Sequence, residues 1–202
     1  MKEEKVFNTL KENMRRPLLI VVSAPSGTGK TTLCRMLVER LENADFSVSV
    51  TSRDPRPGEV QGRDYLFVSE EEFREKIDSG GFLEWAVVHD RYYGTSKDFV
   101  RESLGRGNHV VFDIDVQGGM RIRENQPEAV LIFLLPPSME ELRRRLVGRN
   151  QDGEDEIEKR IGNSYREMRR ALDYDYLVEN RDLDEALEMI LSIITAEKCR
   201  VR

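Results

Sequence analysis

An apolar stretch that runs directly into a glycine-rich loop is the feature that most constrains the fold of this chain. Residues 18–22 are apolar, residues 23–32 read SAPSGTGKTT, and apolar residues then recur at helical spacing from Leu33 to Leu41. This order predicts a strand, a tight loop and a helix. The first N–H groups of a helix lack intrahelical partners and carry partial positive charge, so the loop is predicted to bind phosphate.

The loop matches the phosphate-binding pattern G-x-x-x-x-G-K-[ST] with one departure. Ala24 stands where the first glycine belongs, so we expect it to keep a negative φ. Lys30 is predicted to reach the β- and γ-phosphates of a nucleotide, and the Thr31 hydroxyl is predicted to hold Mg²⁺. The alternative is an ordinary strand-to-helix turn in which the lysine only caps the helix. The residues predicted to surround the phosphates are Ala24, Pro25, Ser26, Gly27, Thr28, Gly29, Lys30, Thr31 and Thr32.

Charge and composition exclude several classes of protein. The 202 residues carry a net charge of −6, which argues against a broad nucleic-acid surface. The two cysteines, Cys34 and Cys199, lie far apart and predict neither a disulfide framework nor a metal cluster, which suits a reducing cytoplasm. No apolar run approaches the roughly 18 residues of a membrane span. We therefore expect a cytoplasmic protein that binds neither nucleic acid nor membrane.

The first sixteen residues form a separate segment. They mix acids and bases and lack the apolar region of a signal peptide. Val6, Phe7, Leu10 and Met14 would lie on one side of a short helix, which packs on the body of the protein or on another subunit. A loose, solvated arm is the alternative. The sequence is compatible both with a monomer and with a homo-oligomer.

Apolar runs alternate with helical stretches along the rest of the chain. The strands are predicted at residues 18–22, 48–51, 65–68, 82–88, 109–114, 130–135 and 176–178. Ser69, Ser138 and Asp182 each stand three residues before a glutamate, a pattern typical of helix starts. A long helix is predicted over 154–172 and a last one over 183–197. The alternation favours an α/β fold with a doubly wound, mostly parallel sheet.

Residues 51–97 interrupt this alternation with short strands, prolines and glycines. They are predicted to form an inserted small α+β lobe with its own sheet. The predicted organisation is an arm or short helix at 1–16, a core at 17–50 and 98–202 that includes a helical lid at about 148–163, and the lobe at 51–97.

Arg53 and Arg56 lie three residues apart on a proline-stiffened segment, RDPRPGE. Two guanidinium groups held in this way are suited to grip one phosphate through charge-assisted hydrogen bonds. Tyr65 and Tyr93 would each add a hydroxyl donor. The alternative is a solvated turn in which both arginines pair with neighbouring acids.

Glu84 lies inside an apolar strand beside the chain's only tryptophan. A buried carboxylate needs a partner, because an unpaired buried charge is costly. The N1–H and exocyclic amine of guanine would supply two parallel donors, whereas adenine presents an acceptor at N1. The alternative is a glutamate on the solvent side of the strand.

Asp113 and Asp115 follow the apolar run 110–112. An acid at the end of such a strand suits a Walker-B role, in which Asp113 holds Mg²⁺ through water. Asp115 would point to the same side and contact the substrate. The alternative is a pair of strand-end acids in the turn before a helix.

Arginines dominate the region after residue 138. Arg145 and Arg149 are four residues apart and share one helix face, and Arg160 follows an acidic stretch. The polar residues 148–153 suit a mobile lid that brings arginines over a transferring phosphoryl group. The alternative is a solvated basic face paired with the acidic run, which we expect to hold for Arg143 and Arg144.

Together these segments resemble bacterial guanylate kinases from residue 17 to about residue 194. The resemblance rests on the ordered set SAPSGTGKT (23–31), TSRDPRPGE (51–59), GRDY (62–65), EWA (84–86), YYGT (92–95) and DIDVQG (113–118). It implies a P-loop NTPase-type fold and transfer of the γ-phosphoryl group from MgATP to GMP.

The resemblance also implies roles for single residues. Lys30 and Thr31 match the residues that hold ATP phosphate and Mg²⁺, Asp113 the acid near Mg²⁺, and Asn180 a contact on the adenine side. The positions that match the GMP site are Ser49, Arg53, Arg56, Tyr65, Glu84, Tyr93, Thr95 and Asp115. The positions that match the lid arginines are Arg145, Arg149 and Arg160.

The chain departs from the family pattern at three places. Ala24 replaces the first glycine of the loop, and Thr95 stands where some members have serine. The Gly-Thr pair that often follows the lid arginine is missing after Arg149.

Two other functions remain open on the sequence alone. One is a related kinase that acts on a ribose phosphate, although Glu84, Thr95 and Tyr65 favour guanine. The other is a non-catalytic interaction module, although Lys30 and Asp113 are retained.

Overall fold

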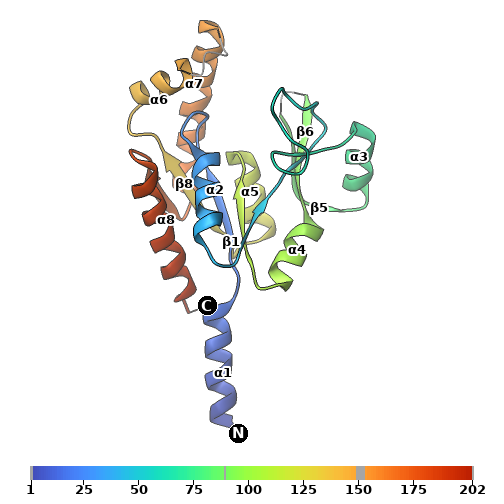
Figure 1. Cartoon of the computed structure of the whole chain (residues 1–202), viewed down its shortest axis with the longest axis vertical. Helices are drawn as coiled ribbons and strands as arrows, with labels where there is room; N and C mark the ends of the chain where they lie inside the picture. The colour runs from blue at the N-terminus through green and yellow to red at the C-terminus, as the bar shows by residue number, and fades with distance from the viewer. Residues whose placement is uncertain (1, 89, 149–152, 202) are drawn as a thin grey trace.

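A five-stranded parallel sheet lies at the centre of the molecule (Figure 1). The computed structural model describes residues 2–88, 90–148 and 153–201. All neighbouring strands of this sheet are parallel, which confirms the predicted doubly wound α/β fold. The strand order is β2 (Ala44–Ser47), β7 (His109–Asp113), β1 (Leu19–Ser23), β8 (Val130–Leu135) and β9 (Tyr176–Glu179).

Both faces of the parallel sheet are buried, and each has its own core. Ile20 and Val22 of β1 belong to one core, and Val21 belongs to the other, because successive side chains of a strand point to opposite faces. Helices α2 and α8 supply the first core, and helices α4 and α5 supply the second. These helices are α2 (Lys30–Arg40), α8 (Leu183–Lys198), α4 (Lys97–Gly105) and α5 (Val116–Asn125).

A smaller mixed sheet lies beside the parallel one (Figure 1). Its order is β4 (Leu66–Phe67), β3 (Val50–Thr51), β6 (Arg91–Ser96) and β5 (Phe82–Val88). Helix α3 (Glu70–Asp78) covers it, and Phe73 of this helix stacks on Phe82 with ring centroids 4.3 Å apart. We call residues 51–97 the small lobe.

Local signals predicted the helix starts well. Ser69 accepts a hydrogen bond from the Glu72 N–H, and the Glu72 carboxylate accepts one from the Ser69 N–H, which completes a capping box. Ser138 and Asp182 likewise cap α6 (Met139–Val147) and α8.

The strand predictions contain two omissions. β2 is an edge strand with the polar sequence ADFS, and β6 reads RYYGTS, so neither shows a clear apolar period. The strand predicted at 48–51 is limited to Val50–Thr51. The helix predicted over 154–172 is α7 (Glu154–Arg169), followed by the 3₁₀ turn η1 (Ala171–Asp173).

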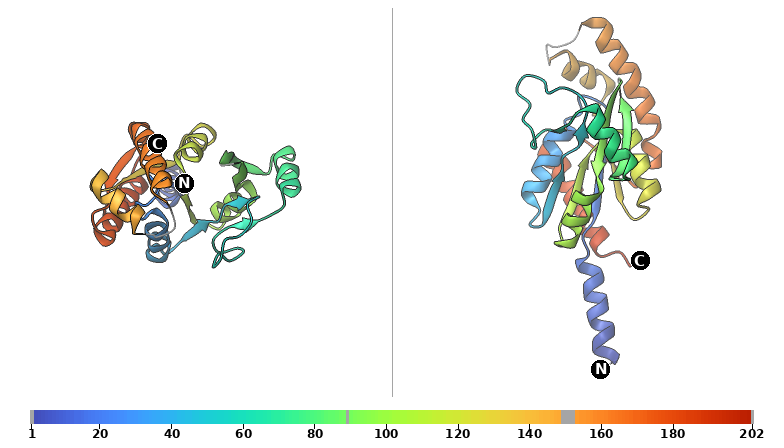
Figure 2. Two further views of the ribbon diagram at one scale, coloured as in Figure 1. Left: turned by 90° about the horizontal axis from the view of Figure 1, so that it is seen from above. Right: turned by 90° about the vertical axis from the view of Figure 1, so that its right-hand side faces the viewer.

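Helices α6 and α7 stand together at one end of the molecule, and α1 (Lys2–Arg15) projects from the other (Figures 1 and 2). The side chains of Val6, Phe7, Leu10 and Met14 are each more than half exposed. The predicted N-terminal helix is therefore present, with its apolar side facing solvent in the single chain. No helix among the described residues is long and apolar enough to cross a membrane.

Candidate active site

A cavity of about 410 Å³ lies between the β1–α2 loop and the small lobe. It brings together residues that are far apart in the sequence, including most of those predicted for the two nucleotide sites. Those that line it are Ala24, Pro25, Ser26, Gly27, Thr28, Gly29, Lys30, Thr31, Thr32, Ser49, Tyr65, Glu84, Tyr93, Asp113 and Asp115.

The β1–α2 loop has the backbone that phosphate binding needs. Gly27 and Gly29 have φ values of +90° and +93°, which L-residues with side chains rarely adopt. The Thr28 hydroxyl donates to the Pro25 carbonyl over 2.8 Å and closes the turn. Among the described residues Asp90 is the one non-glycine with positive φ, so Ala24 keeps the negative φ that its side chain requires.

Lys30 lies at the start of α2 and faces the end of β7. Its ammonium contacts an Asp113 carboxylate oxygen at 2.5 Å and donates to the Ile114 carbonyl over 2.8 Å. Burial alone would lower the pKa of Lys30, but the nearby Asp113 carboxylate outweighs it and the pKa is raised. Lys30 therefore stays charged inside the cavity.

Glu84 is buried, with only 6% of its surface exposed, so the solvent-side alternative is wrong. The Thr95 hydroxyl donates to Glu84 Oε1 over 2.7 Å, and burial raises the pKa of the carboxyl group. A Cβ at Gly118 would lie 3.4 Å from both Glu84 Oε2 and Asp115 Oδ1. Glycine at position 118 thus gives two carboxylates room to converge on the same part of the cavity.

Asp115 also has a structural role. Its Oδ1 accepts a hydrogen bond from the Gly118 N–H over 2.8 Å and caps α5. The alternative of a strand-end acid in the turn before a helix therefore holds for Asp115. Both Asp113 and Asp115 nevertheless line the cavity.

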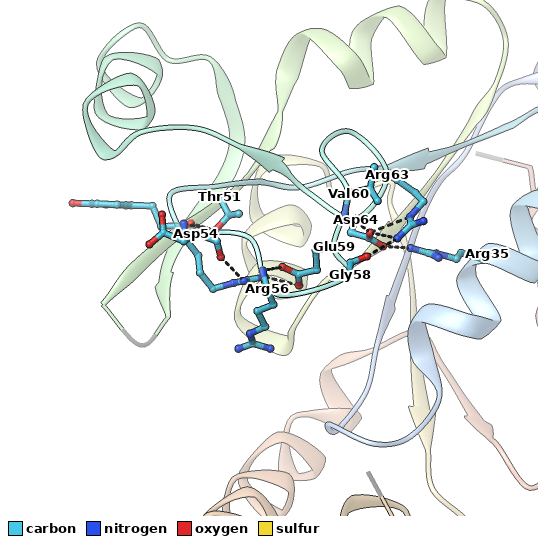
Figure 3. A network of polar contacts seen from close by, with 11 residues as sticks. Arg35, Thr51, Asp54, Arg56, Gly58, Glu59, Val60, Arg63 and Asp64 are labelled. Carbon is cyan, nitrogen blue, oxygen red and sulfur yellow. Dashed lines mark hydrogen bonds and ion pairs between the residues drawn. The ribbon is translucent and has the colours of Figure 1, made fainter. Parts of the chain in front are cut away.

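Arg53 and Arg56 are absent from the described residues that line the cavity. Arg53 pairs with Glu59 over 2.7 Å, and its guanidinium lies 5.3 Å from the centre of the Tyr65 ring. The backbone N–H of Arg56 donates to Glu59 over 2.6 Å, while its guanidinium points away from Glu59 (Figure 3). The structure thus places the Arg53 guanidinium beside Tyr65, a residue of the predicted acceptor site.

Asn180 and Arg145 lie behind the phosphate loop. Asn180 is buried and donates from Nδ2 to the Thr28 carbonyl over 2.6 Å. Arg145 pairs with Glu141 over 2.8 Å, and one of its Nη atoms lies 3.5 Å from the same Thr28 carbonyl. Both residues therefore support the loop backbone.

The other two predicted lid arginines are placed less directly. Arg160 lies on α7, 3.9 Å from Glu156, and is not among the described residues that line the cavity. Arg149 lies outside the described residues. On the outer face of this region Arg143 pairs with Glu158, as the solvated-face alternative predicts.

Glu167 lines the cavity, and sequence reasoning missed it. Burial, followed by repulsion from Asp115, raises the pKa of its carboxyl group to about 7. Helix α7 contains several glutamates, and nothing in their spacing marks this one. Only the packing of α7 against the core brings it to the cavity.

The described residues contain no cluster of three or more His, Cys, Asp or Glu side chains suited to a metal ion. The Thr31 hydroxyl and the Asp113 carboxylate do line the same cavity. Such oxygen donors suit Mg²⁺, which is usually held by one or two protein groups together with substrate phosphates.

Comparison with known proteins agrees with this geometry. The family model described as guanylate kinase matches residues 14–197. A guanylate kinase of Caldanaerobacter subterraneus subsp. tengcongensis is 51% identical, and the match covers 93% of this chain and 91% of that protein. A guanylate kinase of Clostridium tetani is 49% identical, with 93% and 90% covered.

A solved structure indicates the same family. The crystal structure of guanylate kinase from Anaplasma phagocytophilum superposes with a TM-score of 0.76 at 33% identity, covering 92% of this chain and 88% of that one. The resemblance seen in the ordered motifs is thereby confirmed: the chain belongs to the guanylate kinase family.

Proposed function

We propose that the protein transfers the γ-phosphoryl group of ATP to GMP and produces ADP and GDP. The observation that carries this proposal is that the phosphate loop and the buried Glu84, which accepts a hydrogen bond from Thr95, line one cavity. Family membership supports the same activity.

In this proposal Glu84 selects the acceptor base. Thr95 occupies one carboxylate oxygen, and the remaining lone pairs accept hydrogen bonds from the N1–H and amine of guanine. Adenine would present an acceptor to the same carboxylate and leave it unsatisfied in a buried site. Ser49, Tyr65, Tyr93 and Asp115 complete the proposed acceptor site.

Catalysis would come from alignment and charge neutralisation. The attacking atom is a phosphate oxygen that is largely ionised at neutral pH, so the reaction needs neither a strong general base nor a covalent enzyme intermediate. Lys30 and the lid arginines Arg145, Arg149 and Arg160 would neutralise charge on the transferring group. Arg53 and Arg56 would fix the acceptor phosphate, which requires the Arg56 guanidinium to turn inward.

We infer that Mg²⁺ arrives with ATP. The Thr31 hydroxyl and, through water, Asp113 would hold it. When bound, the ion would offset negative charge on the ATP phosphates.

The two proposed nucleotide sites lie mainly on different parts of the chain. Residues 17–50 and 98–202 would hold ATP, residues 51–97 would hold most of GMP together with Ser49 and Asp115 of the core, and the lid at about 148–163 would close over the phosphates and exclude water. Asn180 would act on the adenine side indirectly, by holding the phosphate loop through its hydrogen bond to the Thr28 carbonyl. We place the protein in the cytoplasm because its two cysteines are far apart and unpaired.

An acceptor panel tests the proposal. ADP formation is measured in a coupled assay with MgATP and GMP, AMP, UMP, CMP or ribose 5-phosphate. We expect GMP to exceed each alternative by about 10³-fold or more in kcat/KM, because the wrong acceptor leaves polar groups unpaired. Equal use of AMP would exclude the assigned base recognition, and ATP consumption only with ribose 5-phosphate would favour the related kinase.

Replacement of Glu84 sharpens the test. Glu84→Gln is expected to lower kcat/KM for GMP by about 10- to 100-fold, since one of the two acceptors becomes a donor. Calorimetric titration should show unchanged affinity for MgATP. Glu71→Gln, at an exposed position of α3, is the matched control. Failure of the wild type to bind MgATP would instead favour the interaction module.

A further inference from the structure

The small lobe meets the core of the protein in two different ways. On one side Leu83 of β5 is buried in the core of the parallel sheet, and its carbonyl accepts a hydrogen bond from Asn125 of α5 over 2.9 Å. On the other side Arg35 of α2 reaches across to Asp64 of the small lobe, with an N–O distance of 2.7 Å (Figure 3). One attachment is packed, whereas the other is an ion pair.

The Asp64 carboxylate is shared between these two parts of the molecule. Its Oδ2 accepts hydrogen bonds from the Val60 N–H over 2.9 Å and from Arg63 over 2.7 Å, both within the small lobe. Its Oδ1 accepts the hydrogen bond from Arg35. Hydrogen bonds hold the pKa of Asp64 well below its usual range. The bond from Arg63 contributes most, followed by those from the Val60 N–H and from Arg35. The carboxylate therefore stays charged and keeps both connections.

Residues 58–65, which we call the acceptor loop, contain one residue that the proposed reaction needs and hold two others through Glu59. Asp64 directly precedes Tyr65, which lines the cavity. Glu59 of the same loop holds the Arg53 guanidinium and the Arg56 N–H. A displacement of the acceptor loop would therefore move Tyr65, Arg53 and Arg56 together.

The other end of the ion pair lies on the helix that carries the donor groups. Arg35 stands four residues after Thr31 and five after Lys30 on α2. The Arg35–Asp64 pair is thus a direct connection between the helix that begins at the phosphate loop and the loop that positions the acceptor phosphate.

We propose that Arg35 is a positioning residue that holds the acceptor loop at a set distance from α2, so that GMP meets an assembled site. This rests on the proposed function. Without Arg35 a smaller fraction of molecules has the acceptor loop in place, and the apparent dissociation constant of GMP rises as the inverse of that fraction. Saturating GMP restores the assembled state, so the maximal rate and the ATP site are preserved.

Arg35→Met tests this role. Methionine keeps helix propensity and removes only the guanidinium. We expect KM for GMP to rise about threefold, in keeping with an exposed ion pair, while kcat and KM for ATP stay within about twofold. Arg35→Lys, which keeps a point charge, should recover most of the lost affinity.

Arg40→Met is the matched control on the same helix. Arg40 is exposed and lies 3.6 Å from Glu188, away from the small lobe. It should leave KM for GMP unchanged. Raising KCl to about 0.5 M should narrow the difference between the wild type and Arg35→Met, because salt screens the exposed pair. A purely structural contribution to α2 would not produce that convergence.

A double-mutant cycle with Asp64→Asn completes the experiment. If the two residues act through one another, Arg35→Met adds little to KM for GMP once Asp64 is replaced. Additive effects, or an Arg35→Met variant that matches Arg40→Met, would overturn the role of Arg35. So would a fall in kcat at unchanged KM. A wild type that fails to phosphorylate GMP would instead overturn the proposed function itself.

Discussion

The two sides of the cavity are formed in different ways. The donor side consists of nine consecutive residues, 24–32, whose backbone geometry depends on glycines at positive φ. The acceptor side is assembled from Ser49, Tyr65, Glu84, Tyr93 and Asp115, which come from several elements. One side is therefore formed by local backbone conformation, whereas the other depends on side chains that tertiary packing brings together.

This difference determines which changes each side tolerates. On the donor side an added Cβ is harmful wherever φ is positive. On the acceptor side the geometry is set by bonds between side chains, such as Arg53–Glu59 and Thr95–Glu84.

The largest effect should follow from removing Lys30, the cation within residues 24–32. Lys30→Met is expected to lower kcat for GDP formation by about 10²- to 10³-fold, because charge on the transferring group loses its stabilising partner. Steady-state assay measures this, and circular dichroism checks the fold. Lys97→Met, at an exposed position that contacts the Gly80 carbonyl, is the control. A kcat within about threefold of the wild type would remove Lys30 from its assigned role.

A pair of glycine replacements compares the donor side of the cavity with the acceptor side directly. Gly29 and Gly58 have nearly equal φ values, +93° and +89°. A Cβ at Gly29 would lie 3.0 Å from Asn180 Nδ2, whereas a Cβ at Gly58 would meet nothing within 4 Å. We expect Gly29→Ala to raise KM for ATP by about tenfold or more, and Gly58→Ala to leave it unchanged at a cost of about 1 kcal/mol in stability.

The measurements are KM for ATP and the free energy of unfolding in urea for both variants. An equal rise in KM for ATP in Gly29→Ala and in Gly58→Ala would show that backbone strain alone explains the effect. The proposed contrast between the two sides of the cavity would then be wrong.

The last prediction concerns stability rather than catalysis, at Glu167, which belongs to neither side. Its pKa of about 7 in the folded protein lies above its usual value of 4.5. The folded state therefore binds this proton more tightly, and the resulting stability is present below about pH 4.5 and lost as pH rises to about 7. At pH 8 Glu167→Gln should be about 1–2 kcal/mol more stable than the wild type, a figure reduced for partial exposure.

Urea unfolding at several pH values between 4.5 and 8 measures this difference. A constant difference between wild type and Glu167→Gln across this range would contradict the raised pKa.

The contrast between the two sides also explains what could be predicted from sequence. The β1–loop–α2 unit was predictable because its apolar periods and glycines act locally. The ordered acceptor motifs indicated Glu84 and Tyr65. For Arg53 the alternative of pairing with a neighbouring acid holds, because Arg53 is tied to Glu59 and is absent from the described residues that line the cavity. Which of the two arrangements forms depends on how the acceptor loop folds back, and the motif does not encode that.

Other features had no local signal at all. β2 and β6 are recognisable as strands only through their neighbours in the two sheets. Glu167 differs from the other acids of α7 only in what packs around it. The Arg35–Asp64 pair joins residues whose sequence context marks neither as a partner.

The bond from Asn180 to Thr28 has a consequence for how the protein folds. It joins positions 152 residues apart, and position 180 directly follows β9. The glycine loop can form from local contacts, yet its buried amide brace is in place only once β9 has docked beside β8. A partly folded molecule with β9 undocked would therefore have an unbraced nucleotide cradle.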